Sequence, residues 1–137
     1  MSHKIKIQTK VNAPIEKVWA FWTDTKYIMK WNTPSPDWHT TKATNDLQVG
    51  GKFCSTMAAK DGSMSFDFCG IYDDIIPLQK IAYTLEDNRK VEIVFEEIDN
   101  EVQITEVFEA ENQNSLEMQQ QGWQAILDNF KSCVEKN

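Results

Sequence analysis

The chain has 137 residues, of which 41% are hydrophobic, 11% aromatic and 26% charged, and its formal net charge is −7. This length suits a single domain spanning residues 1–137, and the aromatic content excludes disordered, collagen-like and low-complexity classes. The acidic balance argues against nucleic acid as a partner, because phosphate binding needs clustered cationic side chains. No apolar run approaches the ~18 residues of a membrane helix, and the N-terminal sequence lacks the hydrophobic segment of a secretory signal. We therefore expect a cytoplasmic protein without membrane insertion.

The N-terminal part of the chain predicts a strand followed by two short helices. Residues 5–11 alternate between apolar and polar side chains, as in a half-buried strand. Pro14 then favours the first turn of a helix. The apolar stripe of that helix comprises Ile15, Val18, Trp19 and Trp22. Thr23–Asp24 can cap a second short helix carrying Tyr27, Ile28 and Trp31, and residues 32–37 predict a loop.

A hairpin is predicted around Asp61–Gly62. If these two residues form the loop, Cys54 lies opposite Cys69, and one face of the hairpin is mostly apolar. That face comprises Phe53, Ser55, Met57, Phe66, Phe68 and Tyr72. The three cysteines are odd in number and lack metal-type spacing, so we expect free thiols in a reducing compartment. Under oxidation, the pair Cys54 and Cys69 could cross-link.

A strand near residues 81–85 precedes a second hairpin around Asp99–Asn100. With a two-residue loop there, Ile93 lies opposite Glu106. Glu106 then shares a sheet face with Val91, Ile93, Phe95, Ile104 and Phe108. A carboxylate on an apolar face is costly unless it is paired or hydrated.

The last predicted element is a long helix from Asn114 or Ser115 to about Glu135. Its apolar stripe comprises Leu116, Trp123, Ile126, Leu127, Phe130 and Val134, and it is interrupted by Gln119, Gln120 and Gly122. The order of elements predicts an α+β helix-grip fold: a curved antiparallel sheet of about six to seven strands wrapped around the C-terminal helix, with two short helices after strand one. Such a sheet leaves a cavity beneath the helix.

Several segments resemble a known superfamily. Residues 11–19 and 22–24 are similar to the opening of the helix-grip (SRPBCC) superfamily, which includes START lipid-transfer domains, polyketide cyclases and the birch pollen allergen. Narrower likeness comes from Trp31-Asn32 with Asp37-Trp38-His39, from residues 49–53, and from Gln121-Gly122-Trp123 with Ile126-Leu127 and Phe130. These pieces resemble the activator of heat-shock-protein-90 ATPase homologue-like family over residues 4–135. The resemblance implies a deep, mainly apolar cavity between the sheet and the C-terminal helix.

Three functions agree with this resemblance. The first is binding of a small hydrophobic or amphipathic ligand in the cavity, by a monomer or homodimer. The second is an enzyme of cyclase or hydrolase type that uses the same cavity. The third is a regulator of a chaperone ATPase, with the chaperone as partner. We favour the first, without metal, cofactor or catalysis, because the sequence contains no nucleophile motif, phosphate-binding loop or metal-binding pair.

The expected ligand site combines apolar walls with a few polar groups. It comprises Trp31, Trp38, His39, Met57, Phe66, Phe68, Tyr83, Phe95, Glu106, Gln119 and Trp123. Trp19 and Trp22 are instead assigned to the core, because they share the helix stripe of Ile15 and Val18.

The catalytic candidates are Glu106 and His39. Glu106 could orient a donor group of the ligand or act as an acid with a raised pKa. It could equally be a structural carboxylate near the edge of the sheet, or lie in solvent after a shift of register. His39 could be a general base or a polar anchor, or an exposed residue at a strand edge.

Overall fold

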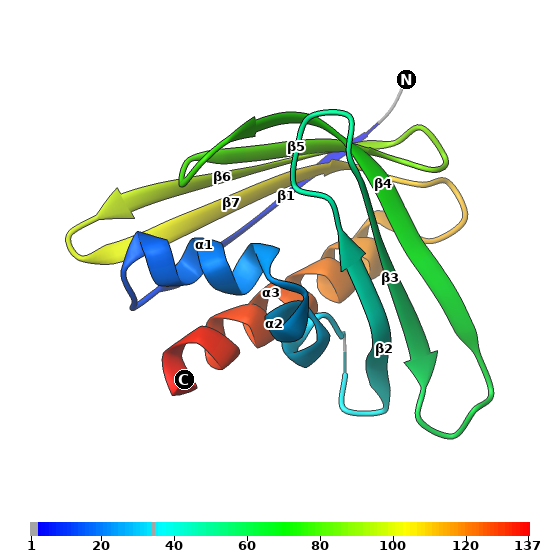
Figure 1. Cartoon of the computed structure of the whole chain (residues 1–137). Helices are drawn as coiled ribbons and strands as arrows, with labels where there is room; N and C mark the ends of the chain where they lie inside the picture. The colour runs from blue at the N-terminus through cyan, green and yellow to red at the C-terminus, as the bar shows by residue number, and fades with distance from the viewer. Residues whose placement is uncertain (1–2, 34) are drawn as a thin grey trace.

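The computed structural model describes residues 3–33 and 35–137, which form one seven-stranded antiparallel sheet and three helices (Figure 1). The elements in chain order are β1 (Lys4–Val11), α1 (Ile15–Thr23), α2 (Thr25–Trp31), β2 (Trp38–Asn45), β3 (Lys52–Ala59), β4 (Ser65–Ile76), β5 (Lys80–Leu85), β6 (Lys90–Ile98), β7 (Glu101–Glu109) and α3 (Leu116–Lys136). The predicted α+β fold, with two short helices after the first strand and a long C-terminal helix, is confirmed.

The strands are ordered β1-β7-β6-β5-β4-β3-β2, so β2 to β7 form a continuous meander. Strand β1 pairs with β7 and forms the edge of the sheet opposite β2. The predicted registers of both hairpins are confirmed: Cys54 pairs with Cys69, and Ile93 pairs with Glu106. The loop between β6 and β7 has positive φ angles at both Asp99 and Asn100. Two such residues form the tight turn whose twist matches that of the strands, which explains why the register follows from the sequence.

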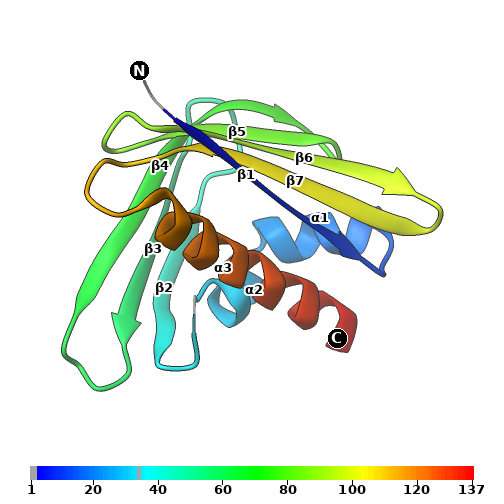
Figure 2. The same ribbon diagram turned by 180° about the vertical axis from the view of Figure 1, so that it is seen from behind.

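The sheet is curved rather than flat. The pairing shifts by one residue at Thr40/Lys42 in β2 and at Tyr72/Asp74 in β4. Bulges of this kind bend a strand and increase its twist. All three helices lie on the concave side of the sheet, and α3 runs across it, as the two opposite views show (Figures 1 and 2).

Local capping explains where two of the helices begin. The carboxylate of Asp24 accepts a hydrogen bond from the backbone N–H of Lys26 at the start of α2, and the hydroxyl of Ser115 accepts one from Met118 at the start of α3. Pro14 directly precedes α1 and stands at its N-cap, one residue before the expected first turn. Its extended backbone, with ψ 150°, turns the chain from β1 into the helix.

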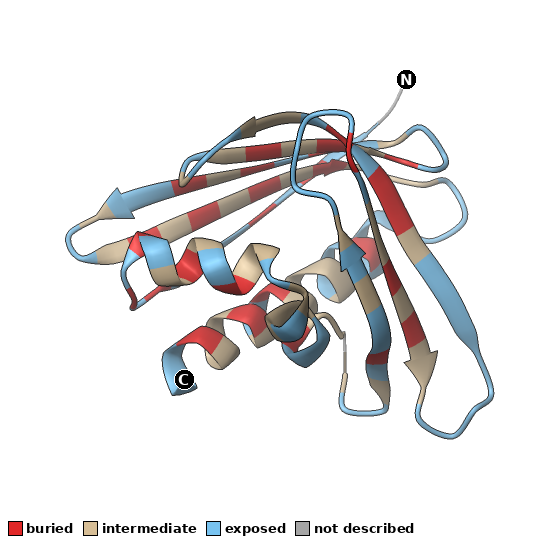
Figure 3. Ribbon diagram, viewed as in Figure 1, coloured by how far each residue is buried: buried red, intermediate tan, exposed pale blue. Residues whose placement is uncertain are grey.

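The core lies between the sheet, α1 and the C-terminal half of α3 (Figure 3). On α3 the fully buried apolar side chains are Leu127, Phe130 and Val134, all in this half. The N-terminal half of the helix contributes Gln119, Gly122 and Trp123 to a cavity wall instead. The single helix stripe seen in the sequence therefore divides into a part that fills the core and a part that faces a space, with Leu127 at the junction of the two.

Candidate functional site

A cavity of about 450 Å³ lies between the concave face of the sheet and the N-terminal half of α3. Its volume falls in the range of small-molecule sites, roughly 300–1,000 Å³. Aromatic rings that form much of the wall are Trp22, Trp31, Phe53, Phe68, Tyr83 and Trp123. Two apolar lining residues are largely exposed, Phe66 at 47% and Met118 at 62%, and they mark the opening of the cavity between the β3–β4 hairpin and the start of α3.

The aromatic wall is held by contacts between rings. Trp22 lies against Trp31 with ring centroids 5.0 Å apart, and the indole N–H of Trp31 donates to the backbone carbonyl of Phe21 at 2.8 Å. Phe53 meets Tyr83 edge to face at 4.7 Å. Because these rings are fixed by packing and by a hydrogen bond, the wall is formed without a ligand.

Glu106 is the buried acid of this wall. It lies in β7, where alternating side chains point to the concave face, and its neighbours on that face are Ile104 and Phe108. The side chain is only 6% exposed, and its carboxyl forms no hydrogen bond or ion pair with a described residue. Burial raises the pKa of Glu106 to about 8. At neutral pH most molecules therefore carry a protonated carboxyl here.

Two neutral hydroxyl groups share the wall with Glu106. Ser55 is 5% exposed. Neither its hydroxyl nor that of Tyr83 forms a hydrogen bond with a described residue. Burial, and then the charge of Glu106, raise the pKa of Tyr83 well above its usual value. Tyr83 therefore stays neutral, as the Ser55 hydroxyl always does, and each hydroxyl can donate a hydrogen bond to an occupant or accept one from it.

Two other polar side chains of the wall, Tyr72 and Arg89, already have partners. The Tyr72 hydroxyl donates to Asn45 Oδ1 at 2.6 Å, and burial raises the pKa of Tyr72 to about 12. Arg89 Nε lies 2.6 Å from Asp87 Oδ2, and Nη1 donates to the backbone carbonyl of Glu109 at 3.4 Å. These groups shape the site without offering it an unsatisfied charge.

Gln119 is buried on α3, and the hydrogen bonds of its side-chain amide all go to the loop before the helix. Its Nε2 donates to the carbonyls of Glu111 and Asn114, and its Oε1 accepts from the Glu111 N–H at 2.9 Å. Gln119 thus fixes the loop at the cavity mouth, although it also lines the wall.

A family model described as "Activator of Hsp90 ATPase homolog 1-like protein" matches residues 12–135. The chain belongs to this family. The AHSA1-like protein from Aeromonas hydrophila, solved by NMR in solution, is 42% identical, with a TM-score of 0.93 over 98% of this chain and 93% of that one. A protein from Cytophaga hutchinsonii is 52% identical, with a TM-score of 0.85 over the same shares. No curated protein matches the chain.

A more distant structure shows the fold alone. The protein CV1439 from Chromobacterium violaceum is 23% identical, with a TM-score of 0.87 over 98% of this chain and 99% of that one. The resemblance to the activator family that the sequence suggested is thus confirmed for the fold and for the family.

In this member of the family, eight of the residues expected in the ligand site line the cavity: Trp31, Met57, Phe66, Phe68, Tyr83, Glu106, Gln119 and Trp123. Trp22, for which the sequence predicts a core position, packs in the core against Phe95 and Phe130. It also lines the cavity. Trp31 likewise has both roles, because it is buried in the core cluster and borders the cavity.

Three expected site residues lie elsewhere. His39 is exposed, because Thr40 takes the inward position next to it in β2. Trp38 contacts Phe66 at 5.8 Å without reaching the wall. Phe95 points inward, but Trp19 and Trp22 cover it at 5.4 and 5.5 Å, so that helix α1 fills the space above it.

Sequence reasoning left several lining residues out of the site. The alternation of β3 predicts Ser55 on the apolar face of its hairpin, and this is the signal that selects it as a lining residue. Asn45 closes the wall by donating to the carbonyl of Thr23 at 2.7 Å, a contact between distant segments. Arg89 precedes β6 in a turn, and no pattern in the sequence indicates its direction.

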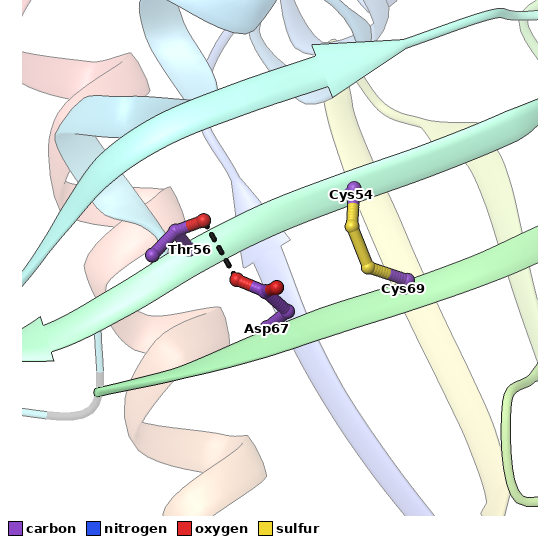
Figure 4. Close-up of a disulfide and its surroundings, with 4 residues drawn as sticks. All are labelled: Cys54, Thr56, Asp67 and Cys69. Carbon is purple, nitrogen blue, oxygen red and sulfur yellow. Dashed lines mark hydrogen bonds between the residues drawn. A yellow bond between two sulfur atoms is a disulfide. The ribbon is translucent and has the colours of Figure 1, made fainter. Parts of the chain in front are cut away.

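The expectation of free thiols is wrong for two of the three cysteines. Cys54 and Cys69 form a disulfide that joins β3 to β4 (Figure 4). The two residues pair directly across the strands, with Cα atoms 4.2 Å apart, so the fold itself brings the sulfurs together. Next to them the Thr56 hydroxyl donates to Asp67 Oδ1 at 2.8 Å. Cys54 and Thr56 flank Ser55 in β3, so both pairs lie on the face of the sheet opposite the cavity. Cys133 keeps a free thiol.

Within residues 3–33 and 35–137, no cluster of three His, Cys, Asp or Glu side chains is arranged to hold a metal ion. In the same part of the chain, no helix is long and apolar enough to cross a membrane.

Proposed function

We propose that this chain binds a small hydrophobic or amphipathic molecule in the cavity beneath α3. The observation that carries the proposal is the combination of a preformed aromatic cavity of about 450 Å³ with a buried carboxyl that has no partner among the described residues. An apolar body would remove the aromatic wall from water, and a polar end would satisfy the groups that face the space. Apolar pockets with few, convergent polar groups are typical of ligand sites.

Gly122 provides a direct test. It lies in the cavity wall, and a Cβ at this position would meet nothing within 4 Å. The Cβ of Gly122→Leu therefore has room, and the rest of its side chain should occupy part of the cavity, while the helix gains propensity. Gln120→Leu is the matched control, because it adds the same side chain to an exposed position of the same helix.

The measurement is quenching of tryptophan fluorescence by a panel of lipophilic compounds, since Trp22, Trp31 and Trp123 line the wall. We expect at least one class of compound to bind the unmodified chain and Gln120→Leu equally, and to bind Gly122→Leu at least tenfold more weakly. Equal binding to both variants would place the ligand outside the cavity. No quenching by any compound would contradict the proposal.

A second function is acid–base catalysis on the bound molecule. Glu106 favours it, because a carboxyl with a pKa of about 8 can give up or take a proton near neutral pH. The test is turnover of a bound compound. Glu106→Gln should abolish the rate while binding persists, and a rate that survives this change would exclude Glu106 as the catalytic acid or base.

A further inference from the structure

The unsatisfied groups of the cavity wall indicate the chemistry of the occupant. Of the acidic and basic side chains in the described wall, Arg89 is paired with Asp87, and the carboxylate of Glu111 accepts hydrogen bonds from Asn114 at 2.8 and 2.6 Å. Glu106 has no such partner. The hydroxyls of Ser55 and Tyr83 are also free, but they cannot supply a charge at ordinary pH. Among the acidic and basic side chains that the structure describes in the wall, only Glu106 is thus left to neutralise an ion.

The charge balance of the wall favours a positive occupant. The wall contains two carboxyl groups and one guanidinium, and the guanidinium is already neutralised by Asp87 at 2.6 Å. The segment 61–137, which supplies β4 to β7 and α3, has five Lys or Arg against seventeen Asp or Glu. An anion would meet this acidic surrounding without a free cationic side chain, whereas a cation would be attracted to it.

The aromatic rings of the wall add to this preference. The faces of Trp and Tyr rings attract cations, and the attraction is stronger in a site removed from water. Trp123 stacks on Phe108, which is the next residue on the inner face of β7 after Glu106. An ammonium group beside Glu106 would therefore lie next to aromatic side chains as well as a carboxylate.

We propose that the molecule bound in the cavity carries an organic ammonium group, with Glu106 as its counter-ion and the aromatic wall around its apolar part. This inference rests on the proposed ligand-binding function and specifies the ligand class for the same site. A neutral ligand could form hydrogen bonds with the buried carboxyl but would bring no opposite charge, whereas an ammonium ion brings that charge.

Binding of such a cation is coupled to the loss of a proton from Glu106. Because burial holds the pKa of this carboxyl at about 8, a cation must displace the proton below that pH, and its affinity should fall about tenfold for each lower pH unit. The other ionisable groups of the wall are Tyr72, Tyr83, Arg89 and Glu111. The pKa values of the two tyrosines lie above this range, and an arginine stays charged throughout it.

The experiment compares three probes with one alkyl tail: octyltrimethylammonium, whose charge does not depend on pH, 1-octanol and octanoate. Each is titrated calorimetrically into the full chain between about pH 6 and pH 9, on either side of the Glu106 pKa. We expect the ammonium to bind at least tenfold more tightly than octanol at the highest pH, and to lose this advantage as the pH falls.

Glu106→Gln should remove both the preference and its pH dependence, while binding of octanol stays within about twofold. Glu96→Gln is the matched control. It removes the same charge from an exposed position on the outer face of β6 and should leave the preference intact.

The outcomes separate the two proposals. If octanol or octanoate binds the unmodified chain as tightly as the ammonium, the ammonium assignment is wrong, but ligand binding in the cavity stands. The ammonium assignment is also wrong, and ligand binding in the cavity again stands, if Glu106→Gln binds all three probes as the unmodified chain does. If none of the probes binds, both proposals fail. The ranking of probes on the unmodified chain decides the assignment even if the Glu106 variant does not fold.

Discussion

The indole of Trp123 lies flat on the ring of Phe108, with centroids 3.9 Å apart and planes inclined by only 9°. This contact joins α3 to β7, and the edge of Phe68 meets the same indole at 5.9 Å. Trp123 therefore does two things at once: it attaches the N-terminal half of the helix to the sheet and forms part of the cavity wall.

Replacing Trp123 by Ala should lower the free energy of unfolding by about 2–4 kcal/mol, because a large ring leaves a space that its neighbours cannot fill. Urea denaturation followed by circular dichroism measures the change. Met118→Ala on the same helix, where the side chain is 62% exposed, should stay within about 0.5 kcal/mol. Equal losses in the two variants would mean that the stacked ring contributes no packing.

Glu106 should make the protein less stable as the pH rises. Burial raises its pKa from 4.5 to about 8, so between these values the folded chain holds a proton that the unfolded chain has released. The contribution of Glu106 to the free energy of unfolding is then greatest below about pH 4.5. It decreases toward pH 8 by at most about 1.4 kcal/mol per pH unit. Above that pH both states are ionised and this decline ends.

The measurement is a series of urea midpoints across this pH range for the unmodified chain and for Glu106→Gln. The amide cannot ionise, so the unmodified chain should lose stability relative to Glu106→Gln as the pH rises from about 4.5 to about 8. Parallel pH profiles would show that the carboxyl of Glu106 is not held in its neutral form.

The registers of the two hairpins could be predicted because turn residues and alternation act over short distances. Asp99 and Asn100 adopt the positive φ angles that a two-residue loop needs, and that loop alone places Glu106 opposite Ile93. The inward direction of Glu106 therefore followed from local rules.

The extent of the cavity could not be predicted in the same way. Phe95 and Phe68 both point to the concave face, yet α1 covers the first and leaves the second at the wall. Which inward residue meets a helix and which meets a space depends on how segments far apart in the chain pack together. Alternation within a strand contains no information on that point.

Gln119 should be important for stability although it is polar. Gln119→Leu removes three hydrogen bonds to Glu111 and Asn114 and should leave the backbone groups of that loop unsatisfied. We expect a loss of about 1–3 kcal/mol in urea denaturation. Gln120→Leu, one position further and exposed, should change stability by less than about 0.5 kcal/mol. A Gln119 variant as stable as the Gln120 variant would contradict the assigned role.

The disulfide predicts a definite count of reactive thiols. Protein denatured without reductant should react with one equivalent of a thiol reagent, at Cys133, and with three after reduction. Because the linked residues are 15 apart, reduction should lower the free energy of unfolding by up to about 3 kcal/mol. Three equivalents without reductant would show that the pair is not oxidised under those conditions.

The position of β1 at the end of the sheet has a consequence for how the chain acquires its structure. Strands β2 to β7 can pair one after another as neighbouring hairpins, each closing a short loop. In β1, Lys4 pairs with Glu109, so this strand must wait for nearly the whole chain. During synthesis, β1 is therefore made well before β7, the strand with which it pairs.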